Sequence, residues 1–231
     1  MPGERLVLFD IDATLLRTQG AGTRAMRRAS RELFGKELAW AGINAAGGLD
    51  PLLFAEAAHR SRLSVGPREC EAFRERYVSL LCADVKHRAG EVQRMPGARD
   101  LLLTLRARKD AVLGLLTGNY AAAAACKLAA VDIDLEWFEV TAFGDEAPSR
   151  SELGAVALKR YEDVRKGVID PQHVVIVGDT PRDVECARAN GFLAFAVATG
   201  KYPAEELLAA GAHAAVDDLT DPEPLVRLVF E

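Results

Sequence analysis

Short, unbroken apolar runs along the chain predict a set of buried strands. The first covers residues 6–9, and two later ones cover residues 111–116 and 173–177. Apolar runs without polar alternation are typical of strands buried on both faces, as in a parallel sheet. The same pattern predicts three further short strands, at residues 140–143, 192–197 and 214–216.

Between about residues 17 and 92 the apolar positions recur at spacings of three and four residues, which is the helical period. A first helix is expected to end at Gly35. Asp50 and Pro51 predict a second helix, with the aspartate as N-cap and the proline at the first helical position. Pro67 opens a third. No convincing strand is predicted in this stretch, which therefore forms a helical block of its own.

Helical patterns alternate with strands from residue 95 onward, near residues 101–105, 121–130, 153–161 and 183–190. Such alternation implies an α/β fold, with a Rossmann-like parallel sheet and helices on both of its faces. Because the helical block follows the first strand, we expect an all-α domain inserted at that point. The predicted domains are an α/β core of residues 1–16 and 93–231 and an inserted helical domain of residues 17–92.

Composition is ordinary for a globular protein, with 49% hydrophobic and 27% charged residues among 231. The net charge of −5 and the mixture of arginine with glutamate leave no basic stripe, so nucleic acid is a poor candidate partner. No apolar stretch reaches the length of a membrane span, and a cytoplasmic protein is the expectation. The sequence does not determine the oligomeric state.

Cysteine and histidine offer no metal or disulfide pattern. Four cysteines are widely scattered, and four histidines are isolated from one another: Cys70, Cys82, Cys126 and Cys186, and His59, His87, His173 and His213. Structural zinc and a disulfide framework normally need closer or regular spacing. Catalysis is therefore expected to use carboxylates.

Polar side chains follow three of the predicted strands directly. They are Asp10 and Asp12, Thr117 and Asn119, and Asp179 and Asp183. The carboxyl ends of parallel strands lie at one edge of the sheet, so these side chains can meet although they are far apart in sequence. The first pair alone could bind a hard cation, act as a nucleophile, or serve as a general acid and base.

Several carboxylates that meet repel one another unless a cation lies among them. Magnesium is the natural candidate, because it prefers oxygen ligands and usually binds beside a substrate phosphate. A phosphate also needs hydrogen-bond donors. Thr117 and the backbone N–H groups around Gly118 and Asn119, at the start of the following helix, can supply them.

Three stretches together resemble the haloacid dehalogenase-like hydrolase superfamily. Asp-Ile-Asp-Ala-Thr-Leu at residues 10–15 is similar to its first motif, Leu-Leu-Thr-Gly-Asn at 115–119 to its second, and Val-Gly-Asp-Thr-Pro-Arg-Asp at 177–183 to its fourth. Their order, their positions after strands and the helical insertion all agree with the family. The resemblance covers essentially the whole chain, and residues 17–92 would be the family's helical cap.

The resemblance implies a role for each matching residue. Asp10 would be the nucleophile that forms an aspartyl-phosphate and would also bind magnesium. Asp12 would protonate the leaving oxygen and then activate water, with its backbone carbonyl as a metal ligand. Thr117 would hold the phosphate. Asp179 would bind the metal, and Asp183 would do so directly or through water.

One position departs from the family pattern, and the residue of the third motif is not uniquely identified. Ala13 stands where the first motif usually has glycine. The alanine side chain leaves the backbone fewer accessible conformations at this position. The third motif is a single Lys or Arg that contacts the phosphate, and Arg150, just before a predicted helix, is the preferred candidate. Lys159 and Lys201 are the alternatives.

Asp12 favours phosphate chemistry over dehalogenation, because the family's dehalogenases lack an aspartate at that position. The nearest resemblance is to the phosphoglycolate phosphatase-like branch with a helical cap, acting on a small phosphoester that the sequence does not specify. A β-phosphoglucomutase-like transfer and a catalytically idle binding protein are the alternatives. Residues 47–50 resemble a substrate-facing loop of relatives, or simply begin a helix.

Overall fold

A computed structural model describes residues 3–231 and contains one six-stranded parallel sheet. Its strands lie in the order β5-β4-β1-β6-β7-β8, so the first strand of the chain is near the centre. The strands are β1 (Arg5–Phe9), β4 (Ala111–Leu116), β5 (Val140–Ala142), β6 (Val174–Gly178), β7 (Leu193–Val197) and β8 (Ala214–Val216). The predicted parallel α/β fold is confirmed, and the ends of β1, β4 and β6 meet at one edge.

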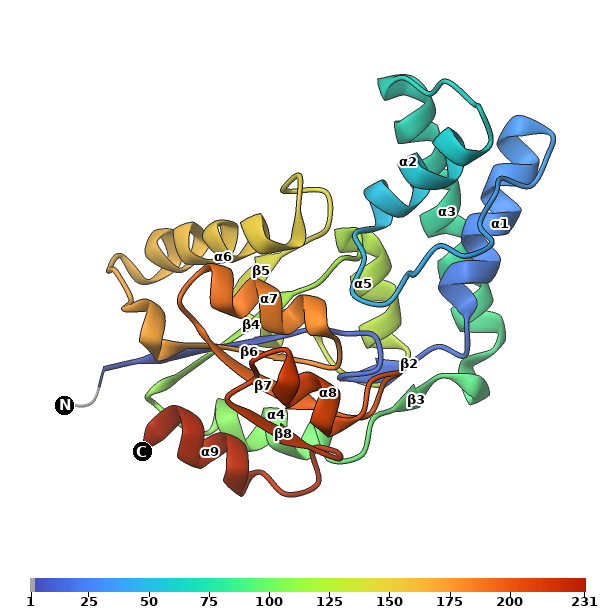
Figure 1. The fold of residues 1–231 in the computed structure, drawn as a ribbon. Coiled ribbons are helices and arrows are strands. Elements are labelled where there is room, and N and C mark those ends of the chain that lie inside the picture. Colours follow the sequence, from blue (N-terminus) through green and yellow to red (C-terminus); the bar gives the residue numbers. More distant parts are fainter. Residues whose placement is uncertain (1–2) are drawn as a thin grey trace.

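Helices cover both faces of this sheet (Figure 1). Alternate residues of each strand point to opposite sides, so Val7 and Phe9 pack on one face and Leu6 and Leu8 on the other. One face is covered by α4 (Ala98–Arg106), α5 (Ala121–Ala129) and α9 (Glu223–Phe230). The other is covered by α6 (Arg150–Arg165) and α7 (Pro181–Ala189), and α8 (Ala204–Ala209) follows β7.

Between β1 and α4 in sequence, three helices project beyond one end of the sheet (Figure 1). They are α1 (Ala21–Phe34), α2 (Asp50–Arg60) and α3 (Pro67–His87). A two-stranded antiparallel ribbon of β2 (Leu16–Arg17) and β3 (Gln93–Arg94) joins them to the sheet. Single 3-10 turns occupy Ala89–Glu91, Leu135–Trp137 and Pro171–His173. The helix end at Gly35 and the helix start at Pro67 are as predicted.

The inserted helices share an apolar cluster with α5 of the sheet domain. Phe54 and Phe73 stack at 3.8 Å between ring centroids, and the cluster extends through Tyr77 to Tyr120 and Ala123, at the start of α5. The insertion is therefore held by side-chain packing as well as by the β2–β3 ribbon. The division into residues 1–16 and 93–231 against 17–92 stays a prediction.

Asp50 does not cap its helix, so the N-cap prediction is wrong. Helix α2 begins at Asp50 itself, and Leu49 occupies the N-cap position without a side-chain hydrogen bond. The Asp50 carboxylate instead accepts a hydrogen bond from the Tyr120 N–H at 3.1 Å, and the Asp50 N–H donates to the Gly118 carbonyl at 2.8 Å. The aspartate thus joins the insertion to the loop after β4.

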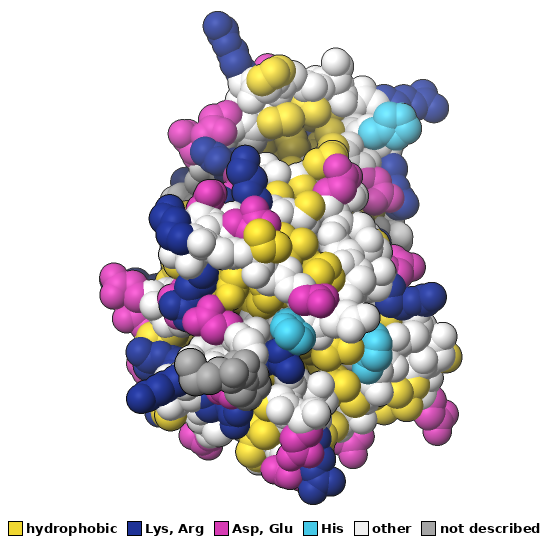
Figure 2. Space-filling view, turned by 90° about the vertical axis from the view of Figure 1, so that its left-hand side faces the viewer, with side chains coloured by type: hydrophobic (Ala, Val, Ile, Leu, Met, Phe, Trp, Pro, Cys, Tyr) yellow, Lys and Arg dark blue, Asp and Glu magenta, His cyan; other side chains and the backbone are white. Residues whose placement is uncertain are grey.

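Basic and acidic side chains are interspersed on the molecular face shown in Figure 2, without a large region of one sign. This agrees with the mixed charge of the sequence. Among residues 3–231, no helix has the length and apolar character needed to cross a membrane.

Candidate active site

Asp10 lies at the carboxyl end of β1, where the strand turns into a tight loop. The Asp10 N–H still donates to the Val177 carbonyl of β6 at 2.9 Å, which fixes the aspartate at the sheet edge. Only 4% of its surface is exposed. Ala13, three residues on, adopts a left-handed conformation with φ of 60°, which explains why glycine suits this position and why alanine restricts it.

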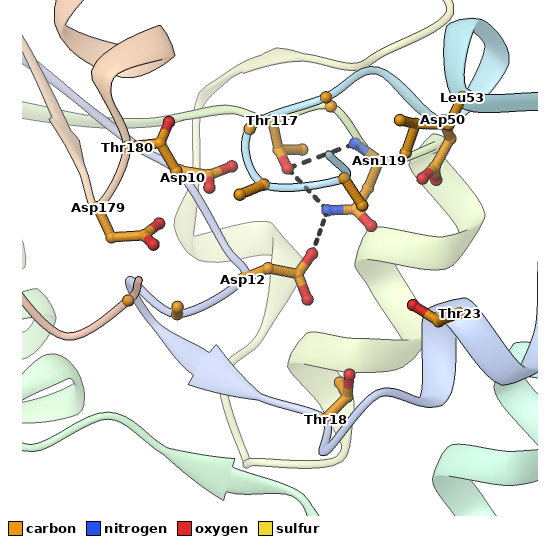
Figure 3. Close-up of a pocket in the computed structure, with 18 of the residues that line it drawn as sticks. Asp10, Asp12, Thr18, Thr23, Asp50, Leu53, Thr117, Asn119, Asp179 and Thr180 are labelled. Atoms are coloured by element: carbon orange, nitrogen blue, oxygen red, sulfur yellow. Dashed lines mark hydrogen bonds between the residues drawn. The ribbon is translucent and has the colours of Figure 1, made fainter. Parts of the chain in front are cut away.

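Asp179 and Asp183 come from the loop after β6 and the first turn of α7. Thr180 is the N-cap of α7, and the Asp183 carboxylate accepts from the Thr180 N–H at 3.0 Å and its hydroxyl at 2.7 Å. This reciprocal capping holds Asp183 in place. The side chain of Asp179 lies opposite Asp10 (Figure 3), and its one hydrogen bond within the described chain is a long one, 3.4 Å from the Thr14 hydroxyl.

Asp10, Asp179 and Asp183 form a buried acidic cluster in which one carboxylate oxygen of each lies within 4.8 Å of the others. Burial, and then the neighbouring carboxylates, raise the pKa of Asp179 to about 8. Burial also raises the pKa of Asp10 to about 6, although Arg150 opposes the shift. The cluster therefore favours a bound cation, and oxygen-only ligands suit magnesium. Because Asp183 already accepts hydrogen bonds from Thr180 and Arg150, its carboxylate is suited to contact such a cation through a water molecule.

Arg150 is the cation that the fold places among these acids. Its guanidinium is 3.2 Å from Asp10 and pairs still more closely with Asp183, and 7% of the side chain is exposed. These carboxylates raise the pKa of Arg150 in spite of its burial. Its Nε is buried and has no hydrogen-bond partner within residues 3–231. The alternative Lys159 is exposed on α6, and Lys201 is exposed at the cavity rim.

Thr117, Gly118 and Asn119 line the same cavity after β4. The Thr117 hydroxyl accepts from the Asn119 side-chain amide at 2.8 Å, and the Thr117 N–H is engaged by the Ala142 carbonyl. The Gly118 N–H has no acceptor among the residues described here. The hydroxyl of Thr117 and the Gly118 amide are therefore the donors that this loop offers to an anion.

Asp12 points away from the acidic cluster and toward Asn119 (Figure 3). Its Oδ2 accepts from Asn119 at 2.9 Å and from Lys127 at 2.5 Å. Burial acts to raise the pKa of Asp12, but the charge and hydrogen bond of Lys127 outweigh it and the pKa is lowered. The side chain of Asp12 is nevertheless 46% accessible and borders the cavity.

Sequence reasoning missed Lys127, and one signal could have found it. The buried positions of α5 are Ala123, Ala124, Lys127 and Leu128, so the lysine occupies the apolar stripe of its helix. A lysine at a core position needs a buried partner. The alanine-rich composition of residues 121–130 predicts a helix, but it does not indicate that position 127 is buried.

The cavity holds about 470 Å³ and is bordered by both the sheet domain and the insertion. The loop before α2 closes against the sheet domain so tightly that a Cβ on Gly118 would lie 1.9 Å from the Gly48 carbonyl. Arg182 of α7 reinforces this contact by donating to the Ala46 carbonyl at 3.0 Å. Residues 47–50 therefore border the site as well as beginning a helix.

Fold and site together define a parallel α/β protein with an acidic centre beneath a helical cap. A family model described as haloacid dehalogenase-like hydrolase matches residues 7–188. The chain belongs to this family. A comparison with curated proteins finds no match.

Solved structures of the same fold cover nearly the whole chain. A hydrolase from Pseudomonas syringae has a TM-score of 0.73 at 19% identity, covering 99% of this chain and 100% of its own. A predicted phosphoglycolate phosphatase from Haemophilus somnus has a TM-score of 0.69 at 18% identity, with coverages of 98% and 99%. A putative β-phosphoglucomutase from Thermotoga maritima has a TM-score of 0.64 at 22% identity, with coverages of 98% and 100%.

Proposed function

We propose that this protein is a magnesium-dependent phosphatase that hydrolyses a small phosphorylated metabolite through a phosphorylated Asp10. The observation that carries the proposal is the buried cluster of Asp10, Asp179 and Asp183, of which Asp10 and Asp179 line one cavity together with Arg150. Magnesium, when bound by these acids, would neutralise their charge and that of the phosphate. The cavity volume of about 470 Å³ suits a small phosphoester.

Binding of the phosphate group would use the donors that line the cavity. Arg150 supplies the positive charge of its guanidinium, and Thr117 and Gly118 supply a hydroxyl and a backbone N–H. These groups would orient phosphorus toward the Asp10 carboxylate. In phosphoryl transfer such positioning and charge neutralisation provide most of the acceleration.

The first chemical step would form a bond between an Asp10 oxygen and phosphorus while the bond from phosphorus to the ester oxygen breaks. The electron pair of the breaking bond stays on the ester oxygen, which takes a proton from Asp12 and leaves as an alcohol. In the second step Asp12 takes a proton from water, and the water oxygen attacks phosphorus. The bond between phosphorus and the Asp10 oxygen breaks and its electron pair stays on that oxygen, so phosphate leaves and the Asp10 carboxylate is restored.

A β-phosphoglucomutase-like reaction remains the alternative, because it would use the same residues and return the phosphoryl group to a second hydroxyl of the sugar. A relative with this fold, CbbY from Rhodobacter sphaeroides, was solved in complex with phosphate and has a TM-score of 0.71 at 20% identity, with coverages of 94% and 96%. Phosphate in a relative's structure agrees with a phosphate-handling site in this fold.

The test is a screen of phosphorylated metabolites with magnesium and with a chelator. Release of inorganic phosphate from at least one ester, dependent on magnesium and abolished by Asp10→Asn, is the expected result. A rearranged phosphoester without phosphate release would indicate a mutase. No turnover of any ester would leave the idle binding protein and contradict the proposal.

A further inference from the structure

Lys127 is a buried lysine in the site that no sequence motif identified. It lies in the last turn of α5, with 4% of its side chain exposed. Its Nζ donates to Asp12 Oδ2 at 2.5 Å and to Asn119 Oδ1 at 2.6 Å. A lone buried ammonium costs several kcal/mol, and this one is compensated by a carboxylate that borders the cavity.

Lys127 and Asn119 bind the same oxygen of Asp12. The Asn119 amide donates to Oδ2 at 2.9 Å and also to the Thr117 hydroxyl, so the three polar groups form one connected set (Figure 3). The other oxygen, Oδ1, has no protein partner among residues 3–231. Two donors on Oδ2 fix the rotation of the carboxylate and leave Oδ1 free for a ligand.

The helix that carries Lys127 is itself firmly placed. Ala123 and Ala124, one turn before the lysine, are fully buried, and their small side chains bring α5 close to its neighbours. Helix α5 packs against both the sheet and the inserted helices, through Leu128 on one side and Ala123 on the other. The ammonium is therefore held by a rigid element, as precise positioning of a reacting group requires.

We propose that Lys127 is a positioning residue that holds Asp12 so that its Oδ1 delivers the proton to the leaving oxygen. This inference rests on the proposed phosphatase function. Asp12 takes this proton from water in the second step of the preceding turnover, and passes it from Oδ1 to the ester oxygen as the bond between phosphorus and that oxygen breaks and its electron pair stays on the oxygen. Lys127 neither gives nor takes a proton in this step.

Two substrates with different leaving groups distinguish this positioning role from a general contribution of Lys127 to the stability of the protein. An alkyl phosphate expels a strongly basic alkoxide and needs the proton, whereas p-nitrophenyl phosphate expels a weakly basic phenolate and does not. The quantity to compare is kcat/KM, because it reports the steps up to loss of the leaving group and excludes the later attack of water. Lys127→Met should lower kcat/KM about 100-fold for an alkyl phosphate and less than about threefold for p-nitrophenyl phosphate.

An equal loss with both substrates would overturn the inference. Lys86→Met, which removes an exposed lysine from α3, is the matched control and should change neither value. If circular dichroism shows that Lys127→Met is unfolded, Lys127→Gln is compared in the same way with the same two outcomes. Failure of the wild-type protein to hydrolyse any ester would contradict the proposed function, which is a different result.

A double variant gives an independent measurement. If Lys127 acts through Asp12, then Lys127→Met should cause little further loss of alkyl phosphate hydrolysis once Asp12→Asn has removed the acid. Undiminished loss in the Asp12→Asn background would contradict a positioning role.

Discussion

Within residues 3–231, Arg150 is the residue whose charge links Asp10, the proposed nucleophile, to Asp183 of the acidic cluster. It pairs with both Asp10 and Asp183 and is almost fully buried. Because these carboxylates have few other cationic neighbours, removal of the arginine leaves buried negative charge without compensation. The arginine should therefore affect folding as well as phosphate binding.

Arg150→Met should lower kcat/KM for a phosphoester by at least about 100-fold, as loss of one preorganised donor to a developing charge typically does. It should also lower the free energy of unfolding, measured without magnesium by chemical denaturation, by about 3 kcal/mol. Lys159→Met is the control and should change the stability by no more than about 0.5 kcal/mol. Full activity of Arg150→Met would assign the phosphate contact to another cation, with Lys201 as the next candidate.

At the scale of elements, the loop before α2 packs directly against the loop after β4. Gly118 touches the Gly48 carbonyl, and Gly47, with φ of 63°, faces the Thr180 hydroxyl in the same way. A side chain at either glycine would meet atoms of the opposite domain. These two positions therefore require glycine if the loops are to pack this closely.

Gly118→Ala should disrupt the contact between the two loops without unfolding the protein. The added Cβ would lie 1.9 Å from the Gly48 carbonyl, so the cap must open while the sheet domain remains intact. We expect kcat/KM to fall by at least about tenfold, with an unchanged circular dichroism spectrum and faster proteolysis in the cap loop. Gly90→Ala is the control, because no atom lies within 4 Å of its Cβ position. Unchanged activity of Gly118→Ala would show that this contact is not needed for catalysis.

The strands and most of the helices were predictable because their signal is local. Unbroken apolar runs identified β1, β4 and β6, and the polar residues that follow them supplied Asp10, Thr117 and Asp179. The short helices α8 and α9 and the two-residue strands β2 and β3 carry too little pattern to be recognised.

Residues whose role depends on a distant partner could not be predicted. Lys127 becomes a partner of Asp12 only when two segments 115 positions apart meet. Local rules favour Asp50 as a helix cap. In the structure its carboxylate instead accepts a hydrogen bond from the Tyr120 N–H, across the contact between the insertion and the sheet domain. Local sequence rules describe one element at a time and do not include such contacts.

At the scale of the whole molecule, the acidic cluster links stability to pH and to metal. The pKa of Asp179 is raised from 3.8 to about 8, and that of Asp10 from 3.8 to about 6. The folded protein therefore keeps protons that the unfolded chain has lost in this range. Without metal, the contribution of Asp10 and Asp179 to the free energy of unfolding is greatest at low pH. It falls as the pH rises through their pKa values in the folded protein.

The melting temperature in a chelator should accordingly be lower at about pH 9 than at about pH 6. Magnesium should raise it more at the higher pH, where the carboxylates are ionised. At 100 times its Kd, a metal adds about 2.7 kcal/mol, or roughly 5 to 10 °C for a chain of this size. Asp179→Asn is the control and should remove most of the magnesium effect. A magnesium shift that is independent of pH would contradict a site built from these acids.

The most direct test of the central claim is to find the phosphoryl group on Asp10. Asp12→Asn, incubated with p-nitrophenyl phosphate and magnesium, should still form the intermediate, since this leaving group needs no acid, and should hydrolyse it slowly because the base is absent. Acid quenching followed by peptide mass spectrometry is expected to show one phosphoryl group on Asp10. Its presence on another residue, or hydrolysis of p-nitrophenyl phosphate with no phosphorylated protein at any time point, would contradict the account.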